Sequence, residues 1–149
     1  MNVEIRDVPE VPTICSRAAC GPGEIGVTLT RLLPSLGGAI RRLGARPIGP
    51  PYCRYLRMDA DGFELEGGIA LAEAVSPEPP FAAATLGGRC AFFVHVGPYD
   101  TLHQTYAELG RWIEENGYAS AGPAWDLYVD DPGEVAPEAL RTEIYWPIA

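Results

Sequence analysis

The sequence contains no lysine, so all 11 of its basic residues are arginine. Its 20 aspartate and glutamate residues outnumber them and give a formal net charge of −9 at pH 7. A protein that binds nucleic acid directly needs a basic surface to neutralise phosphates, so this balance argues against that class. An acidic field instead attracts cations and discourages anionic ligands.

Long apolar runs and clustered metal ligands are also missing. No stretch approaches the roughly 18 apolar residues that a membrane span requires, and no apolar signal core follows Met1. We therefore expect a cytoplasmic protein without membrane contact. The four cysteines form no Cys-x-x-Cys pair, and His95 and His103 lie eight residues apart. This spacing predicts no metal site and no cofactor, with reduced thiols and with histidines that are structural or exposed.

An internal repeat organises the chain. The matched segments are Gly21-Pro22 with Gly97-Pro98, residues 44–56 with residues 117–129, and residues 66–71 with residues 143–148. The second match keeps a constant offset over glycine, proline and aromatic positions, which two copies of one unit explain better than chance similarity does. We therefore predict one domain over residues 1–149, made of repeat one at about 1–74, a Pro-rich linker at 75–87 and repeat two at about 88–149.

Each copy is predicted to contain a strand, a helix and two further strands. The predicted elements are strand 3–17, a helix ending at Gly44 and strands 52–58 and 63–73, then strand 89–96, a helix from Asp100 or Thr101 to Asn116 and strands 124–130 and 142–148. Pro34 interrupts the apolar spacing of the first helix, which should kink there or begin near that residue. Two βαββ copies predict an α+β domain with both helices on one side of an antiparallel sheet.

Three segments resemble those of GyrI-like domains, the small-molecule-binding modules of several bacterial multidrug-responsive regulators. They are Val94–Asp100, Gly122–Tyr128 and Thr142–Ile148. The resemblance spans nearly the whole chain and implies two pseudo-symmetric units with a groove between them. In that family aromatic side chains stack on flat, often cationic molecules, and a buried acidic residue holds the charge. We expect the stand-alone form, because 149 residues leave no room for a helix-turn-helix module.

Glu143 is the first candidate for such a groove. It lies in an otherwise apolar strand, where a carboxylate is costly to bury unless it is paired or used. Strand alternation places it on one face with Tyr145. A solvent-facing Glu143 fits the sequence as well, and its match to Glu66 is what favours a role in the groove.

Aromatic residues gather on three of the predicted strands and supply the other candidates. The expected ligand-binding residues are Tyr52, Tyr55, Glu66, Gly68, Trp125, Tyr128, Glu143, Tyr145 and Trp146. A planar cation over tyrosine or tryptophan gains about 0.5–2 kcal/mol per contact, although large aromatics also commonly fill a core. Tyr106 and Trp112 are assigned to the core. The Gly67-Gly68 pair indicates a close approach by another group or a simple bulge.

Three functions remain open from the sequence. The first is binding of small, flat aromatic or cationic molecules, for sequestration or sensing. The second follows from the resemblance to stand-alone relatives thought to hydrolyse cyclopropane-bearing DNA alkylators, with Glu143 as general base and Tyr128 or Tyr55 as proton donor. The third, also implied by the resemblance, is a protein partner, namely modulation of DNA gyrase.

Overall fold

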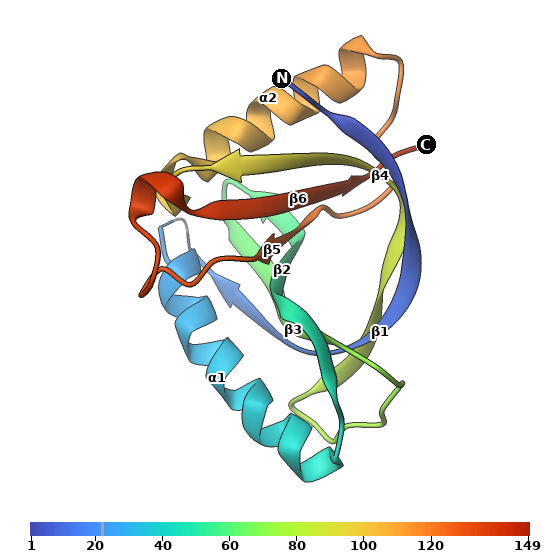
Figure 1. Ribbon diagram of the computed structural model, residues 1–149, viewed down its shortest axis with the longest axis vertical. Coiled ribbons are helices and arrows are strands. Elements are labelled where there is room, and N and C mark those ends of the chain that lie inside the picture. The colour runs from blue at the N-terminus through green and yellow to red at the C-terminus, as the bar shows by residue number, and fades with distance from the viewer. Residues whose placement is uncertain (22) are drawn as a thin grey trace. The chain divides into compact units, whose positions relative to one another are not determined.

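The computed structural model describes residues 1–21 and 23–149 and shows an α+β fold. The elements, labelled in Figure 1, are β1 (Glu4–Cys20), α1 (Ile25–Leu43), β2 (Pro47–Asp59), β3 (Gly62–Leu71), β4 (Ala82–Val96), α2 (Leu102–Glu115), β5 (Trp125–Tyr128) and β6 (Arg141–Pro147), with short 3-10 helices at Tyr99–Thr101 and Pro137–Ala139. Pro22, half of the predicted Gly21-Pro22 match, lies outside the described residues. Within the described part, no helix is long and apolar enough to cross a membrane.

The chain divides into two compact units. We call residues Pro9–Gly87 the α1 unit, and Met1–Val8 together with Gly88–Ala149 the α2 unit. The division falls next to residue 88, where the sequence predicts that the second copy begins. The first eight residues, however, belong to the α2 unit.

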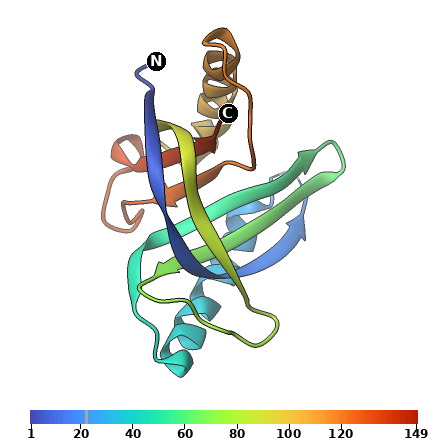
Figure 2. The same ribbon diagram turned by 90° about the vertical axis from the view of Figure 1, so that its right-hand side faces the viewer.

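In the α1 unit, β3 pairs antiparallel with both β1 and β2. Figure 2 shows strands β2 and β3 side by side in a long hairpin, which the predicted turn at residues 59–62 closes. The core lies between these strands and α1, and its buried members are Ile14, Leu36, Ala39, Ile40 and Leu71. A Cβ atom on Gly67 would lie 3.4 Å from Leu33 and 3.5 Å from Leu29. The face of β3 that carries Gly67 therefore packs on α1.

Helix α1 is longer than the sequence predicts. It runs unbroken from Ile25 to Leu43, with Pro34 inside it, so the expected start near Pro34 is wrong. Proline removes one backbone hydrogen bond from a helix. Here Pro34 is exposed, while Leu32 and Leu36 are buried on the same stripe on either side of it. Burial of this continuous stripe outweighs the lost bond. Gly44 ends the helix in the left-handed conformation, as predicted.

In the α2 unit, β6 pairs antiparallel with both β4 and β5. Helix α2 packs on this sheet and shares its buried core, which consists of Ala91, Leu102, Leu109, Ile113, Ile144 and Ile148. Tyr106 and Trp112 pack against that core, as expected from the helical spacing. The strand β4 begins at Ala82, earlier than the predicted Arg89, and β5 is shorter than the predicted 124–130.

Candidate functional site

The face of β3 opposite α1 carries the first candidate, Glu66. Strand alternation sends Gly67 toward the helix and therefore Glu66 and Gly68 to the other face. Arg17 of β1 and Arg54 of β2 stand directly opposite Glu66 in the two ladders. We call Thr13, Arg17, Tyr52, Arg54 and Glu66 the Glu66 cluster.

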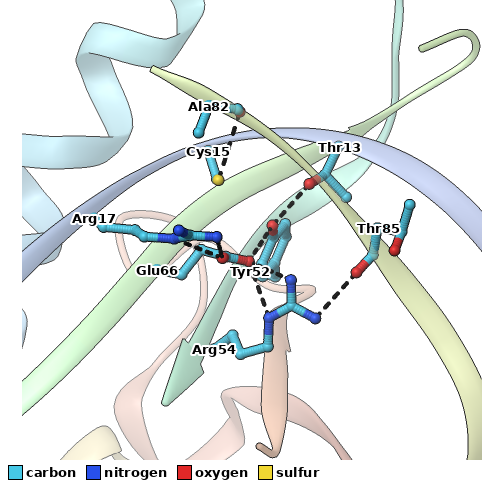
Figure 3. A network of polar contacts seen from close by, with 8 residues as sticks. All are labelled: Thr13, Cys15, Arg17, Tyr52, Arg54, Glu66, Ala82 and Thr85. Carbon is cyan, nitrogen blue, oxygen red and sulfur yellow. Dashed lines mark hydrogen bonds and ion pairs between the residues drawn. The ribbon is translucent and has the colours of Figure 1, made fainter. Parts of the chain in front are cut away.

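The carboxylate of Glu66 is fully buried, with 0% of the side chain exposed, and both of its oxygens are engaged. Arg17 donates to Oε1 from Nε at 3.2 Å and from Nη2 at 3.1 Å. Arg54 donates to Oε2 from Nε at 3.0 Å and from Nη2 at 2.6 Å. The Tyr52 hydroxyl also donates to Oε2, at 2.9 Å, and lies 2.9 Å from the hydroxyl of Thr13. Figure 3 shows these side chains converging on Glu66.

This arrangement makes Glu66 a poor partner for a ligand cation. A buried carboxylate is tolerated only when charges and hydrogen bonds compensate it, and here two guanidinium groups already do so. Burial, reinforced by the charge of Glu66, raises the pKa of Tyr52 far above its usual value, so its hydroxyl stays a donor. The same causes raise the pKa of the Cys15 thiol to about 11, which leaves it protonated and unreactive.

Gly68 is explained by close approach, one of the two readings of the Gly67-Gly68 pair. A Cβ atom there would lie 2.6 Å from three atoms of the Tyr52 ring and hydroxyl. The ladder is regular at this point, with Tyr52 directly opposite Gly68. A bulge is therefore not the reason for this glycine, which instead makes room for the buried tyrosine.

The face of β6 opposite α2 carries the second candidate, Glu143. Ile144 belongs to the core under α2, so Glu143 and Tyr145 lie on the other face. Tyr145 stands opposite Trp125 of β5 and Phe92 of β4. We call Phe92, Trp125, Glu143 and Tyr145 the Glu143 cluster.

Aromatic contacts hold Tyr145 in place within this cluster. Its ring stacks on Trp125 with centroids 5.3 Å apart and an angle of 8° between the planes. Phe92 packs against it at 5.0 Å with a tilt of 56°. The Tyr145 hydroxyl donates to Oε1 of Glu143 at 2.9 Å. Burial and this bond raise the pKa of Tyr145 to about 12, so the hydroxyl remains a donor at neutral pH.

Glu143 itself is only half-buried. Among the described residues its carboxylate forms no ion pair, and its hydrogen-bond partner is the tyrosine hydroxyl. A carboxylate whose partner is neutral has no counter-charge from that partner, and in a partly desolvated setting a carboxylate attracts a cation more strongly than in water. The arrangement can therefore hold a positively charged group beside an aromatic stack.

Three of the predicted aromatic residues lie outside both clusters. Tyr55 stands opposite Leu65, on the face of the hairpin that packs on α1. Tyr128 stands opposite Thr142, away from Glu143, and its ring meets Tyr99 edge-on at 5.6 Å. The indole nitrogen of Trp146 donates to the Ser120 hydroxyl at 2.9 Å, and the Trp146 ring packs near Tyr106 on the helix side. The donor paired with Glu143 is thus Tyr145, whereas the sequence predicts Tyr128 or Tyr55.

Several polar residues of the two units are not predicted from the sequence. Arg17 and Arg54 could not be predicted as partners of Glu66, because only the strand register brings them next to it. Asp126 is fully buried and accepts a hydrogen bond of 2.9 Å from Tyr106, on the α2 side of the sheet. A signal was available for Asp126, since it is an acidic residue between Trp125 and Leu127 in a short apolar strand. Among the described residues, no group of three side chains is placed to hold a metal ion.

Comparison with known proteins gives a family and a fold. A family model described as a GyrI-like small-molecule-binding domain matches residues 1–149. Among curated proteins, none matches the chain.

Solved structures share the fold at low sequence identity. The EcmrR C-terminal domain has a TM-score of 0.86 and 20% identity, and the match covers 99% of this chain and 97% of that one. Against EcmrR in a complex with DNA, the values are 0.83 and 21%, and the match covers 99% of this chain but 57% of that longer chain.

Two further structures are a ligand complex and a hydrolase. SAV2435 bound to tetraphenylphosphonium has a TM-score of 0.67 and 16% identity, with coverage of 100% of this chain and 94% of that one. A hydrolase from Listeria innocua has a TM-score of 0.68 and 18% identity, with coverage of 99% and 91%. At these identities the likeness establishes the fold.

Proposed function

This chain belongs to the GyrI-like family of small-molecule-binding domains, and we propose that its ligand is a flat aromatic cation that contacts the Glu143 cluster. The observation that carries the proposal is the half-buried Glu143 carboxylate, which has no ion pair among the described residues and lies beside the stacked rings of Tyr145 and Trp125. A carboxylate next to aromatic faces suits a delocalised cation, because both attract positive charge.

Charge supports a cation as the ligand class. The net charge of −9 favours the approach of cations over anions and nucleic acid. The neighbour SAV2435 is described as bound to tetraphenylphosphonium, an aromatic cation. The Glu66 cluster is the weaker candidate, because two arginines already neutralise its carboxylate.

The test is a titration of rhodamine 6G, a planar aromatic cation, followed by fluorescence anisotropy. We expect a dissociation constant in the micromolar range, or about −8 kcal/mol. The variant Glu143→Gln should weaken binding by about 1–3 kcal/mol, because it leaves the cation without its counter-charge. Glu138→Gln removes an equal charge at an exposed position of the same unit and is the matched control. Equal affinity of Glu143→Gln and Glu138→Gln would rule out the proposed contact.

Hydrolysis of a cyclopropane-bearing alkylator is a second candidate, favoured by the Glu143–Tyr145 contact. Such a reaction needs a base that takes a proton from water and a donor for the oxygen on which negative charge develops. Glu143 supplies the base, and the hydroxyl of Tyr145 supplies the donor once it turns from Glu143 to the substrate. Water then adds to a ring carbon, the strained C–C bond breaks, and its electron pair moves to the conjugated oxygen, which is protonated.

Mass spectrometry separates the two candidates. A hydrolase should convert a cyclopropane-bearing alkylator to its ring-opened, water-added product, and Glu143→Gln should slow turnover by about 10²–10⁴-fold. A compound that binds but opens at its spontaneous rate identifies a binding protein instead.

We further infer that the α1 unit and the α2 unit are copies of one βαββ unit. The support is that each has the same order of elements and that in each the last strand pairs with the other two. The groove between copies and the modulation of DNA gyrase stay predictions from the family resemblance.

A further inference from the structure

An arginine of the chain already occupies one aromatic ring of the Glu143 cluster. The guanidinium carbon of Arg6 lies 3.5 Å from the centroid of the Phe92 ring. Phe92 is buried and packs against Tyr145, the residue that donates to Glu143. The positive charge of Arg6 also reaches the Tyr145 hydroxyl, where it lowers the pKa and so opposes the effect of burial.

Glu4 holds this arginine in position. Its Oε2 atom accepts a hydrogen bond of 2.8 Å from Nε of Arg6 and forms an ion pair with Nη2 at 2.8 Å. Glu4 and Arg6 are two residues apart on β1 and therefore project from the same side of the strand. The Arg6 side chain is 43% exposed, so water reaches the guanidinium while the guanidinium covers the ring.

The chemistry of this contact resembles that of the proposed ligand. A guanidinium group is a planar, delocalised and weakly hydrated cation, and such groups stack on aromatic faces. Phe92 therefore presents a surface that accepts a flat cation, and in the free protein that cation is the arginine of the chain itself.

We propose that Arg6 is an internal competitor for the cation site, which a planar cationic ligand must displace from Phe92 before it binds fully. The inference rests on the proposed function and deepens it by naming the property that the ligand must have. A flat, delocalised cation can replace a guanidinium on the ring, whereas a compact ammonium ion is strongly hydrated and gains less there. Displacement also moves the positive charge of Arg6 away from the incoming cation.

Affinity for rhodamine 6G provides the first test. Arg6→Met keeps an apolar stem of similar reach but cannot compete as a cation, so its dissociation constant should fall about two- to five-fold, the range of an exposed cation–π contact. Arg57→Met is the matched control, because Arg57 is 42% exposed and pairs with Asp59 two residues away. It removes the same charge at a position in the α1 unit. Arg6→Lys keeps the charge but loses the planar group, and should fall between the wild type and Arg6→Met.

The outcomes separate this inference from the proposed function. If Arg6→Met and Arg57→Met change the affinity for rhodamine 6G equally, the effect comes from net charge alone, and the proposal that Arg6 competes with the ligand is refuted. If the wild type binds the dye, Glu143→Gln weakens binding and Arg6→Met binds as the wild type does, the proposed function stands and Arg6 has no role. If no variant binds the dye, the proposed function itself is wrong.

The Nε–Hε signal of Arg6 in a ¹H–¹⁵N spectrum gives a second readout that does not depend on affinity. In the free protein the ring current of Phe92 should shift the Hε proton upfield of that of Arg57. Saturation with rhodamine 6G should return the Arg6 signal to the position of an exposed arginine. A signal that stays upfield in the saturated complex shows that Arg6 remains on Phe92 and overturns the proposal.

Discussion

The Glu66 and Glu143 clusters have the same place in their units and opposite electrostatic character. Each glutamate lies on the last strand of its unit, on the face turned away from the helix. Glu66 is fully buried and bound by two arginines, whereas Glu143 is half-buried and bound by a tyrosine hydroxyl. The position on the strand therefore does not decide the role of the carboxylate. The residues that stand directly opposite the carboxylate on the neighbouring strands decide that role.

The aromatic residues next to the two glutamates differ in the same way. In the α1 unit, the Tyr52 ring fills the space above Gly68, and its hydroxyl donates a hydrogen bond to Glu66. In the α2 unit, Tyr145 is the residue that the proposed repeat matches to Gly68, and it stacks on Trp125. One cluster is therefore closed by its own side chains, and the other keeps a half-exposed carboxylate beside aromatic rings. This difference predicts stability effects at Glu66 and binding effects at Glu143.

Glu66→Gln should produce the largest effect and would show whether the closed cluster is structural. The substitution leaves Arg54, which is only 16% exposed, without its counter-charge. Breaking a buried ion pair on one side typically costs about 3–5 kcal/mol, and the exposure of Arg17 reduces this toward about 3 kcal/mol. Urea unfolding measures the loss.

Glu64→Gln is the control for that measurement, because Glu64 lies on the same strand but is exposed and its contact with Arg57 is 3.5 Å long. It should change the free energy of unfolding by less than about 0.5 kcal/mol. A Glu66→Gln protein as stable as Glu64→Gln would remove the distinction between a structural and a binding carboxylate.

Gly68→Ala should produce the next largest effect and tests how tightly the closed cluster is packed. The new methyl group would lie 2.6 Å from the Tyr52 ring and hydroxyl, and overpacking of this kind costs about 1–3 kcal/mol. Gly67→Ala is the neighbouring control, since its Cβ atom would meet Leu33 at 3.4 Å, an ordinary contact distance. In the double variant Gly68→Ala/Tyr52→Leu the clash should disappear, so the two losses should not add. Additive losses would show that Tyr52 is not what Gly68 accommodates.

Much of the fold could be predicted because it depends on local signals. The apolar spacing of α2, the stop at Gly44 and the turn at residues 59–62 each follow from a few neighbouring residues. The exposed Pro34 misled the helix prediction, because a local breaker was outweighed by a buried stripe that continues on both sides of it.

The candidate site was harder to predict because it depends on register. From the turn at residues 59–62, a regular hairpin would place Tyr55 opposite Glu66. The ladder shifts by one residue between Tyr55 and Arg57, and this shift places Arg54 opposite Glu66 instead. One extra residue in β2 thus gives Glu66 a cationic neighbour in place of an aromatic one. No sequence pattern near Leu56 predicts this shift. Glu143 and Tyr145 were predicted to share a face, and their hydrogen bond confirms it, because no shift separates residues two apart on one strand.

Tyr145→Phe should produce the smallest effect, and it tests the neutral partner of Glu143 through the dependence of stability on pH. The pKa of Tyr145 is raised from 10.0 to about 12 in the folded protein, so the folded state holds this proton at pH values where the unfolded chain releases it. Stability therefore falls as the pH rises, beginning near 10 and ending near 12. At pH 11 the wild type should have lost about 1 kcal/mol more than Tyr145→Phe, relative to each protein at pH 8, with allowance for the partial exposure of the ring. The phenyl ring preserves the stack on Trp125, so the comparison isolates the hydroxyl. Urea unfolding at the two pH values measures the difference, and parallel losses in both proteins would show that the Tyr145 hydroxyl is neither buried nor bonded to Glu143 in solution.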